Sequence, residues 1–347
     1  MSFIENLFGG KKDSTSVVLV DISADSVAGA YVLYTAGENP TMLYTRRFPV
    51  VAREGEMQER AMLRALELLG ETLLREGAPV LMRAVGSGSI ESVLVSIDAP
   101  WQKTSVRTEH FEQTEPFVFT RGLVAEKVAS TSIKVPEQLR VDESVIGTIL
   151  NGYETRNPYG KEANRASIVI LTSFIDERVA EAVISMLRGF YHTKNVRPIA
   201  GNSLRFQAIR YAFPHERDAL ILDVTDSSTS IALVRRDLFV AIAEATSAEE
   251  NDSWVKNVTS ELTDIAKHYP LPRTIFLLAR ETKVESLQKQ LGAADLGKLW
   301  LSDDPPKVVA VLPSHVSALV RQSPSSSPDL LLLLMTLFAQ AREGQGE

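Results

Sequence analysis

The 347-residue chain contains no cysteine. This absence excludes disulfide bonds, thiolate metal sites and cysteine nucleophiles, and it fits a cytoplasmic protein. Histidine is scarce as well, and the few histidines are scattered without the spacing of a metal site: His110, His192, His215, His268 and His315. We therefore expect neither a cysteine nor a histidine metal centre.

Long apolar runs and an excess of basic charge are also missing. The longest apolar run, residues 330–338 with one threonine inside it, is shorter than the roughly 18–20 residues that a helix needs to cross a bilayer. The net charge of −7 disfavours a nucleic-acid-binding protein, because phosphate neutralisation requires clustered Lys and Arg. We expect a cytoplasmic protein that binds no nucleic acid and is at most peripheral at a membrane.

A β-hairpin with a hydroxyl-rich tip stands out in the second half of the chain. The apolar residues 219–222 lead into Asp223, and the polar turn that follows contains Thr225, Ser227 and Ser228 ahead of a second apolar run. Two apolar strands joined by a short polar turn are typical of a hairpin.

A weaker copy of this hairpin lies near the N-terminus. Residues 17–20 form an apolar run ahead of Asp21, and the turn that follows holds Ser23 and Ser26. Two such hairpins in one chain predict a duplicated α/β core. We expect the hairpins to face each other across a cleft and to grip one phosphate chain, because backbone N–H groups in tight turns bind phosphate oxygens.

The other elements follow from hydrophobic periodicity and turn signals. Helices are predicted over residues 56–76, 123–130, 176–190, 203–212, 254–266, 283–291 and 329–342. Strands are predicted over 41–51, 91–97, 145–153, 166–172, 273–279 and 307–312, with strand pairs over 104–119 and a flexible polar loop over 321–328.

This order of elements predicts an α/β protein in three segments. The first half of the duplicated core covers residues 1–103, and a compact α+β module covers 104–196. The second half covers 197–347, with a reduced upper lobe.

These features resemble the actin-like ATPase superfamily, in the branch that contains the pilus assembly protein PilM and the cell-division protein FtsA. The start of the first hairpin, Asp21-Ile22-Ser23, and the turn Asn157-Pro158-Tyr159-Gly160 are similar to family motifs, and residues 196–208 resemble the link into the second half. The resemblance covers roughly residues 17–342. It implies an actin-like (ribonuclease H-like) duplicated core with an inserted small α+β subdomain.

The resemblance also implies a site for ATP and Mg²⁺. It assigns Asp21 and Asp223 to Mg²⁺ through water, since magnesium keeps much of its hydration shell. The residues that it places at the cofactor are Asp21, Ser23, Ser26, Asp223, Thr225, Ser227 and Ser228. The residues themselves leave an alternative equally open, in which the two acids cap turns at strand ends and hold no metal.

Departures from the family pattern favour the loss of ATP hydrolysis. The tip of the second hairpin has no glycine, although the family is glycine-rich there, and Ala279-Arg280 replaces the glycine pair before the adenosine-binding helix. The stretch between residues 239 and 273 is short for the lobe that closes over the base. Whether the chain is an enzyme stays open at this point.

The resemblance implies a scaffold or adaptor of bacterial type IV pilus machinery that docks the cytoplasmic tail peptide of a membrane protein. It would lie in the cytoplasm or at the inner membrane, with indirect membrane contact and a capacity for self-association. One alternative is an FtsA-like division filament protein with a C-terminal membrane anchor, and another is an ATPase that switches with nucleotide. The apolar residues 330–338 favour a helix packed in the core over an anchor.

Overall fold

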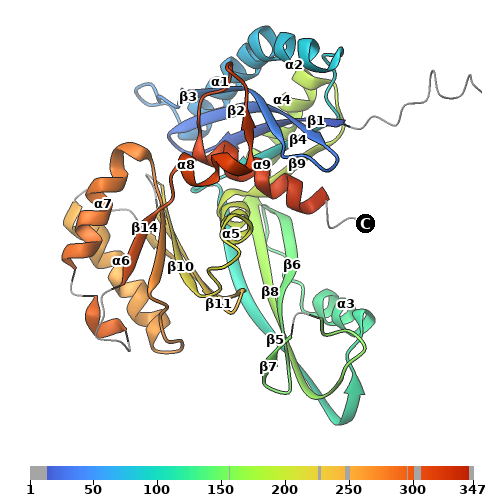
Figure 1. Cartoon of the computed structure of the whole chain (residues 1–347), viewed down its shortest axis with the longest axis vertical. Helices are drawn as coiled ribbons and strands as arrows, with labels where there is room; N and C mark the ends of the chain where they lie inside the picture. Colours follow the sequence, from blue (N-terminus) through green and yellow to red (C-terminus); the bar gives the residue numbers. More distant parts are fainter. Residues whose placement is uncertain are drawn as a thin grey trace, which may run out of the picture. The chain divides into compact units, whose positions relative to one another are not determined.

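The computed structural model describes residues 14–155, 157–225, 228–246, 251–294, 296–300 and 306–343 (Figure 1). By the contacts between its residues, the chain divides into two compact units. The first unit takes the described residues of Met1–Ile97, Val179–Ala212 and Pro313–Glu347, and the second takes those of Asp98–Arg178 and Phe213–Leu312. Each unit therefore combines segments that are far apart in the sequence.

A six-stranded sheet forms the centre of the first unit, in the order β15-β3-β2-β1-β4-β9. The first three strands form an antiparallel meander, and β4 and β9 extend it in parallel from β1. The strands are β1 (Ser14–Ile22), β2 (Ser26–Thr35), β3 (Thr41–Pro49), β4 (Ser92–Ile97), β9 (Val196–Ala200) and β15 (Arg321–Gln322).

Helices cover both faces of this sheet, with α1, α2 and α4 on one face and α9 on the other (Figure 1). Because both faces are covered, β1 and β4 read as continuous apolar runs rather than alternating ones. The helices are α1 (Gln58–Thr72), a π-helical turn (Leu73–Gly77), α2 (Ala78–Val85), α4 (Glu177–Tyr191), α5 (Gly201–Ala212), α8 (Pro313–Val316), a 3₁₀ turn (Ser317–Leu319) and α9 (Leu330–Glu343).

The second unit contains a five-stranded sheet in the order β12-β11-β10-β13-β14. Apolar side chains of α6 and α7, such as Trp254 and Leu287, pack on it against Leu222 and Ile231. Its elements are β10 (Ala219–Val224), β11 (Ser228–Arg235), β12 (Leu238–Thr246), α6 (Asn251–Ala266), β13 (Thr274–Leu278), α7 (Glu281–Ala293), a 3₁₀ turn (Gly297–Leu299) and β14 (Lys307–Ala310).

The two central sheets repeat one topology. In each, an antiparallel three-stranded meander is followed by two parallel strands beside its first strand: β3-β2-β1-β4-β9 in one and β12-β11-β10-β13-β14 in the other. The predicted duplication of the core is therefore confirmed.

The inserted module is also present, as a separate four-stranded antiparallel sheet in the order β5-β8-β6-β7. It lies between β4 and α4 in the sequence, and by its contacts it belongs to the second unit. Its elements are β5 (Gln102–Val118), α3 (Arg121–Ser130), β6 (Gln138–Leu150), β7 (Tyr153–Glu154) and β8 (Glu162–Asp176). The division into segments 1–103, 104–196 and 197–347 stays a prediction.

The segment before α9, predicted as a polar loop over residues 321–328, begins with a short strand. Arg321–Gln322 pairs in parallel with the edge of β3, and the backbone N of Ser323 donates to the carbonyl of Met42 at 3.0 Å. The Ser323 hydroxyl also reaches the carbonyl of Leu43. The Ser323 hydroxyl thus bonds to the backbone of the sheet edge, which composition alone does not reveal.

The C-terminal helix packs into the core of the first unit, as its composition favours. Residues 332–338 of α9 are buried, and α9 packs against α5, β1 and β2. The Tyr34 hydroxyl on β2 donates to the carbonyl of Thr336 at 3.1 Å. Among the helices of the described residues, none has the length and apolar character needed to cross a membrane.

Candidate functional site

The first hairpin places Asp21 in a row of three residues across the sheet. Asp21 on β1 pairs with Ala28 on β2, and Ala28 pairs with Arg47 on β3. Residues in register on neighbouring strands point to the same face. Because Ala28 is small, the Arg47 side chain can extend across it to Asp21.

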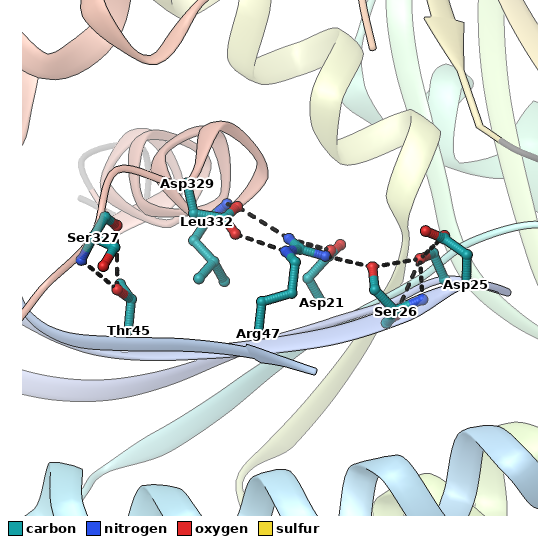
Figure 2. Close-up of polar contacts among 9 residues, drawn as sticks. Asp21, Asp25, Ser26, Thr45, Arg47, Ser327, Asp329 and Leu332 are labelled. Carbon is teal, nitrogen blue, oxygen red and sulfur yellow. Dashed lines mark hydrogen bonds and ion pairs between the residues drawn. The ribbon is translucent and has the colours of Figure 1, made fainter. Parts of the chain in front are cut away.

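Arg47 joins Asp21 to the beginning of the C-terminal helix (Figure 2). Its Nη2 donates to Asp21 Oδ2 at 3.1 Å and to Asp329 Oδ1 at 3.0 Å, and its Nε donates to Asp329 Oδ2 at 2.7 Å. Its Nη1 donates to the Ser26 hydroxyl at 2.7 Å. One guanidinium therefore binds two carboxylates and a hydroxyl from three different elements.

The electrostatics of this cluster favour a permanently charged arginine. Burial alone would lower the pKa of Arg47, but the negative charges of Asp329 and Asp21 outweigh it and hold the pKa above its ordinary value. The side chain of Asp21 is 1% exposed and that of Arg47 is 31% exposed. A carboxylate so thoroughly removed from water requires a cationic or hydrogen-bonding partner, which Arg47 supplies.

The turn of the first hairpin uses its own hydroxyl groups to satisfy its backbone. The Ser23 N donates to the Ser26 carbonyl at 2.9 Å, and the Ser26 N donates to the Ser23 hydroxyl at 3.3 Å. The Ser23 hydroxyl lies 2.7 Å from the Asp25 carboxylate. Two N–H groups that a phosphate-binding turn would aim at its ligand are therefore used within the turn.

The second hairpin repeats this turn. Asp223 is the penultimate residue of β10, as Asp21 is of β1. The Thr225 N donates to the Ser228 carbonyl at 2.9 Å, and the Ser228 N donates to the Thr225 hydroxyl at 3.1 Å. The predicted site residue Ser227 lies outside the described residues.

The cross-strand row of the second hairpin carries a different charge. Asp223 pairs with Ser230 on β11, and Ser230 pairs with Glu244 on β12. The position that corresponds to Arg47 therefore holds an exposed acid. The structure brings Asp21, Ser23 and Ser26 together in one unit, and Asp223, Thr225 and Ser228 in the other. That the two hairpins face each other across a cleft stays a prediction.

A hydrated Mg²⁺ does not fit beside Asp21 in this arrangement. A metal held through water would lie close to the Asp21 carboxylate, where Arg47 Nη2 already stands at 3.1 Å. A divalent cation about 4 Å from the guanidinium would be repelled by roughly 8 kcal/mol at an effective dielectric constant of about 20. The ion pair with Arg47 thus favours Asp21 as a strand-end acid over Asp21 as a metal ligand.

The described residues contain no group of three or more His, Asp or Glu side chains that could hold a metal ion. The pair Ala279-Arg280 lies between β13 and α7, where Arg280 takes the N-cap position. Burial lowers the pKa of Arg280 from its ordinary value. The roles predicted for Asp223, Thr225 and Ser228 at a nucleotide stay predictions.

Arg47 and Asp329 are the residues of this cluster that the sequence did not single out. Two signals were present. Arg47 lies within a predicted strand that also holds apolar residues, and Asp329 stands directly before the apolar run of α9 as a typical N-cap. The Leu332 N indeed donates to Asp329 Oδ1 at 3.2 Å. Neither signal indicates that the two residues bind each other.

No protein-family model matches this sequence, and no curated protein matches it. The structure is similar to a solved structure described as the PilM–PilN type IV pilus biogenesis complex, with a TM-score of 0.57 and 15% sequence identity over 94% of this chain and 98% of that chain. The predicted actin-like ATPase fold is thereby confirmed.

Two other solved structures are more distant. A Bacteroides thetaiotaomicron protein with an actin-like ATPase fold and unknown function has a TM-score of 0.46 and 10% identity, over 96% of this chain and 99% of that chain. An exopolyphosphatase from Cytophaga hutchinsonii has a TM-score of 0.40 and 13% identity, over 82% of this chain and 74% of that chain.

Proposed function

We propose that this actin-fold chain is a scaffold or adaptor that docks the cytoplasmic tail peptide of a membrane protein. The observation that carries the proposal is the structural similarity to the PilM–PilN complex, which extends over nearly the full length of both chains. The chain would act in the cytoplasm at the inner membrane, within type IV pilus machinery, and its contact with the membrane would be indirect.

The inserted module offers apolar side chains for such a peptide. Tyr159 is 44% exposed, its ring stacks on Phe119 at 6.0 Å between centroids, and the Arg121 guanidinium lies 5.0 Å from its ring centroid. Exposed aromatic rings held by neighbouring side chains are typical anchors in protein interfaces. Other exposed apolar residues of the module are Val118, Ile133, Val135 and Tyr153.

Loss of ATP hydrolysis is part of the proposal. It is supported by the guanidinium that faces Asp21, by hydroxyl groups that close both hairpin turns, and by the replacement of a glycine pair by Ala279-Arg280. A docking protein does not need a working nucleotide site, so these features leave the adaptor role intact.

A peptide-binding experiment tests the adaptor. Labelled peptides of the cytoplasmic tails of membrane proteins encoded by neighbouring genes are titrated with the full chain, and fluorescence anisotropy is recorded. We expect saturable binding to one tail, weakened in Tyr159→Ala and unchanged in Tyr269→Ala, a matched exposed tyrosine after α6. Absence of binding to every tail would contradict the proposal.

The two rival functions predict different results. An ATPase that switches with nucleotide would be stabilised by millimolar Mg-ATP, because a ligand that binds only the native state raises its unfolding temperature. A membrane-anchored filament protein would co-sediment with anionic liposomes through its C-terminal helix. The buried face of α9, residues 332–338, argues against that anchor. We expect neither a thermal shift nor co-sedimentation.

A further inference from the structure

We infer that Arg47 is a built-in counter-cation, which occupies the place of a hydrated metal ion at Asp21 and clasps the C-terminal helix to the first hairpin. The Arg47 clasp is defined as Arg47 with Asp21, Ser26 and Asp329 (Figure 2). The clasp involves no partner peptide, so a test of the clasp gives a result that does not depend on the adaptor role.

The Arg47 guanidinium donates hydrogen bonds from all three of its nitrogens to residues of the first unit. Its Nε and Nη2 form a bidentate pair with the two oxygens of Asp329, the geometry in which arginine binds carboxylates most strongly. The second N–H of Nη2 reaches Asp21 Oδ2, and Nη1 reaches the Ser26 hydroxyl. Without Arg47, the Asp21 carboxylate and the Ser26 hydroxyl would be the groups that the hairpin presents to a metal-bound phosphate.

The sheet geometry explains why this cation lies where it does. Asp21, Ala28 and Arg47 form one row across β1, β2 and β3, on the face that α9 covers. Ala28 has no side chain beyond Cβ and is fully buried. The arginine therefore extends beneath α9 along the sheet surface and arrives between the two carboxylates.

The other end of the clasp fixes the position of α9. Asp329 caps this helix, because its Oδ1 accepts from the Leu332 N at 3.2 Å and its carbonyl accepts from the Leu333 N at 2.9 Å. Beside it, the Thr45 hydroxyl donates to the Ser327 carbonyl at 3.2 Å. The clasp thus connects the strand that carries Asp21 to the last helix through side chains of the chain itself.

Replacement of Arg47 tests the clasp. In Arg47→Met the guanidinium is lost, and Asp21 and Asp329 are left as two carboxylates that converge on one small space. The control is Arg46→Met, the neighbouring residue on β3, whose exposed guanidinium lies over the ring of Phe48 instead. Thermal unfolding in EDTA and in millimolar MgCl₂, and Mn²⁺ binding followed by electron paramagnetic resonance, are measured on the full chain.

We expect the wild-type chain and Arg46→Met to unfold at the same temperature with and without Mg²⁺ and to bind no Mn²⁺. Arg47→Met is expected to unfold at least about 4 °C lower in EDTA, to regain part of this loss in MgCl₂, and to bind Mn²⁺. The added change Asp329→Asn should abolish that binding.

Three results would overturn the inference. The first is an Arg47→Met chain as stable as Arg46→Met, which would leave the clasp without a stabilising role. The second is an Arg47→Met chain that loses stability but does not respond to Mg²⁺ or Mn²⁺, since the guanidinium would then not stand in place of a metal ion. The third is Mn²⁺ binding by the wild-type chain that Asp21→Asn removes. Should Arg47→Met fail to fold, Arg47→Gln removes the same positive charge with a polar side chain, keeps both carboxylates and is measured in the same way.

Discussion

Ser23 and Thr225 close two hairpins in different halves of the chain with the same pair of hydrogen bonds. Each hydroxyl accepts from the backbone N three residues ahead, in Ser26 and Ser228, and lies within 3.0 Å of the carbonyl of that same residue. Each also stands two residues after the acid of its strand end. The turn is therefore a property of the repeated unit, and in both copies its backbone donors serve the turn itself.

Removal of the Thr225 hydroxyl tests this turn. Thr225→Val keeps the shape of the side chain but loses the bonds to Ser228, and we expect the free energy of unfolding to fall by about 0.5–1.5 kcal/mol. Thr225→Ser keeps the hydroxyl and should stay within about 0.5 kcal/mol of the wild type. Urea unfolding followed by circular dichroism measures both. A Thr225→Val chain that is as stable as the wild type would show that the hydroxyl does not stabilise the turn.

The two halves have diverged at the position beside this turn. In the first half the row runs Asp21, Ala28, Arg47, and in the second it runs Asp223, Ser230, Glu244. The two copies thus share one backbone pattern, while the corresponding position holds a cation in one copy and an acid in the other. A ligand at the first hairpin would therefore meet the positive charge of Arg47, and a ligand at the second would meet the negative charge of Glu244.

Enlargement of Ala28 should break the Arg47 clasp without changing any charge. Ala28→Leu fills the space through which Arg47 reaches Asp21, so it combines overpacking with loss of the ion pair. We expect a fall of about 1–3 kcal/mol in the free energy of unfolding. The control is the same change in the Arg47→Met background, where it should cost clearly less. A cost that is equal in both backgrounds would indicate overpacking alone.

Sequence patterns located most elements of the fold because short apolar runs and helical periodicity are local signals. Sequence patterns gave wrong boundaries where the end of an element depends on tertiary packing. The first helix was predicted to end at residue 76, yet the helical segment continues to Val85, and its C-cap Gly86 takes the left-handed conformation at φ 73°. A Cβ at Gly77 would lie 2.6 Å from the ring of Tyr31 and 3.0 Å from that of Tyr44, so this glycine allows close packing.

Strands whose partners are distant were also misjudged. Residues 104–119 were predicted as strand pairs, but they belong to one long strand, Gln102–Val118, which pairs with β8 on both sides of an irregularity between Glu112 and Phe117. No strand was predicted over residues 196–200, but they form β9 beside β4. At the candidate site, the acid and hydroxyl residues could be found from their turn pattern. The pairing of Arg47 with Asp329 depends on strand register and on where α9 packs, and neither is a local property.

Burial of α9 predicts unequal costs for two leucine truncations in the first unit. Leu334 on α9 is fully buried, and Leu68 on α1 is 46% exposed. We expect Leu334→Ala to lower the free energy of unfolding by about 2–5 kcal/mol, and Leu68→Ala to change it by less than about 0.5 kcal/mol. Denaturant unfolding of the full chain measures the difference. Similar small costs at both positions would mean that α9 is not part of the core.

Alkaline pH should destabilise the first unit through its buried tyrosines. Burial raises the pKa of Tyr31 and of Tyr44 to about 12, and it raises the pKa of Tyr191 well above its ordinary value. Since the folded state holds these protons more tightly than the unfolded state, their contribution to stability is complete below pH of about 10 and is lost as pH rises towards 12.

The loss should amount to roughly 1.4 kcal/mol for each unit of pKa difference. Unfolding temperature and tyrosinate absorbance are measured together between neutral and strongly alkaline pH. We expect exposed tyrosines such as Tyr153 to ionise in the folded chain. The buried tyrosines, Tyr31, Tyr44 and Tyr191, should ionise only when the chain unfolds. Tyr44→Phe, which removes the hydroxyl that donates to Glu76 Oε2 at 2.6 Å, should reduce the alkaline loss. If all tyrosines ionise together while the chain stays folded, the burial of Tyr31 and Tyr191 cannot hold their protons in this way.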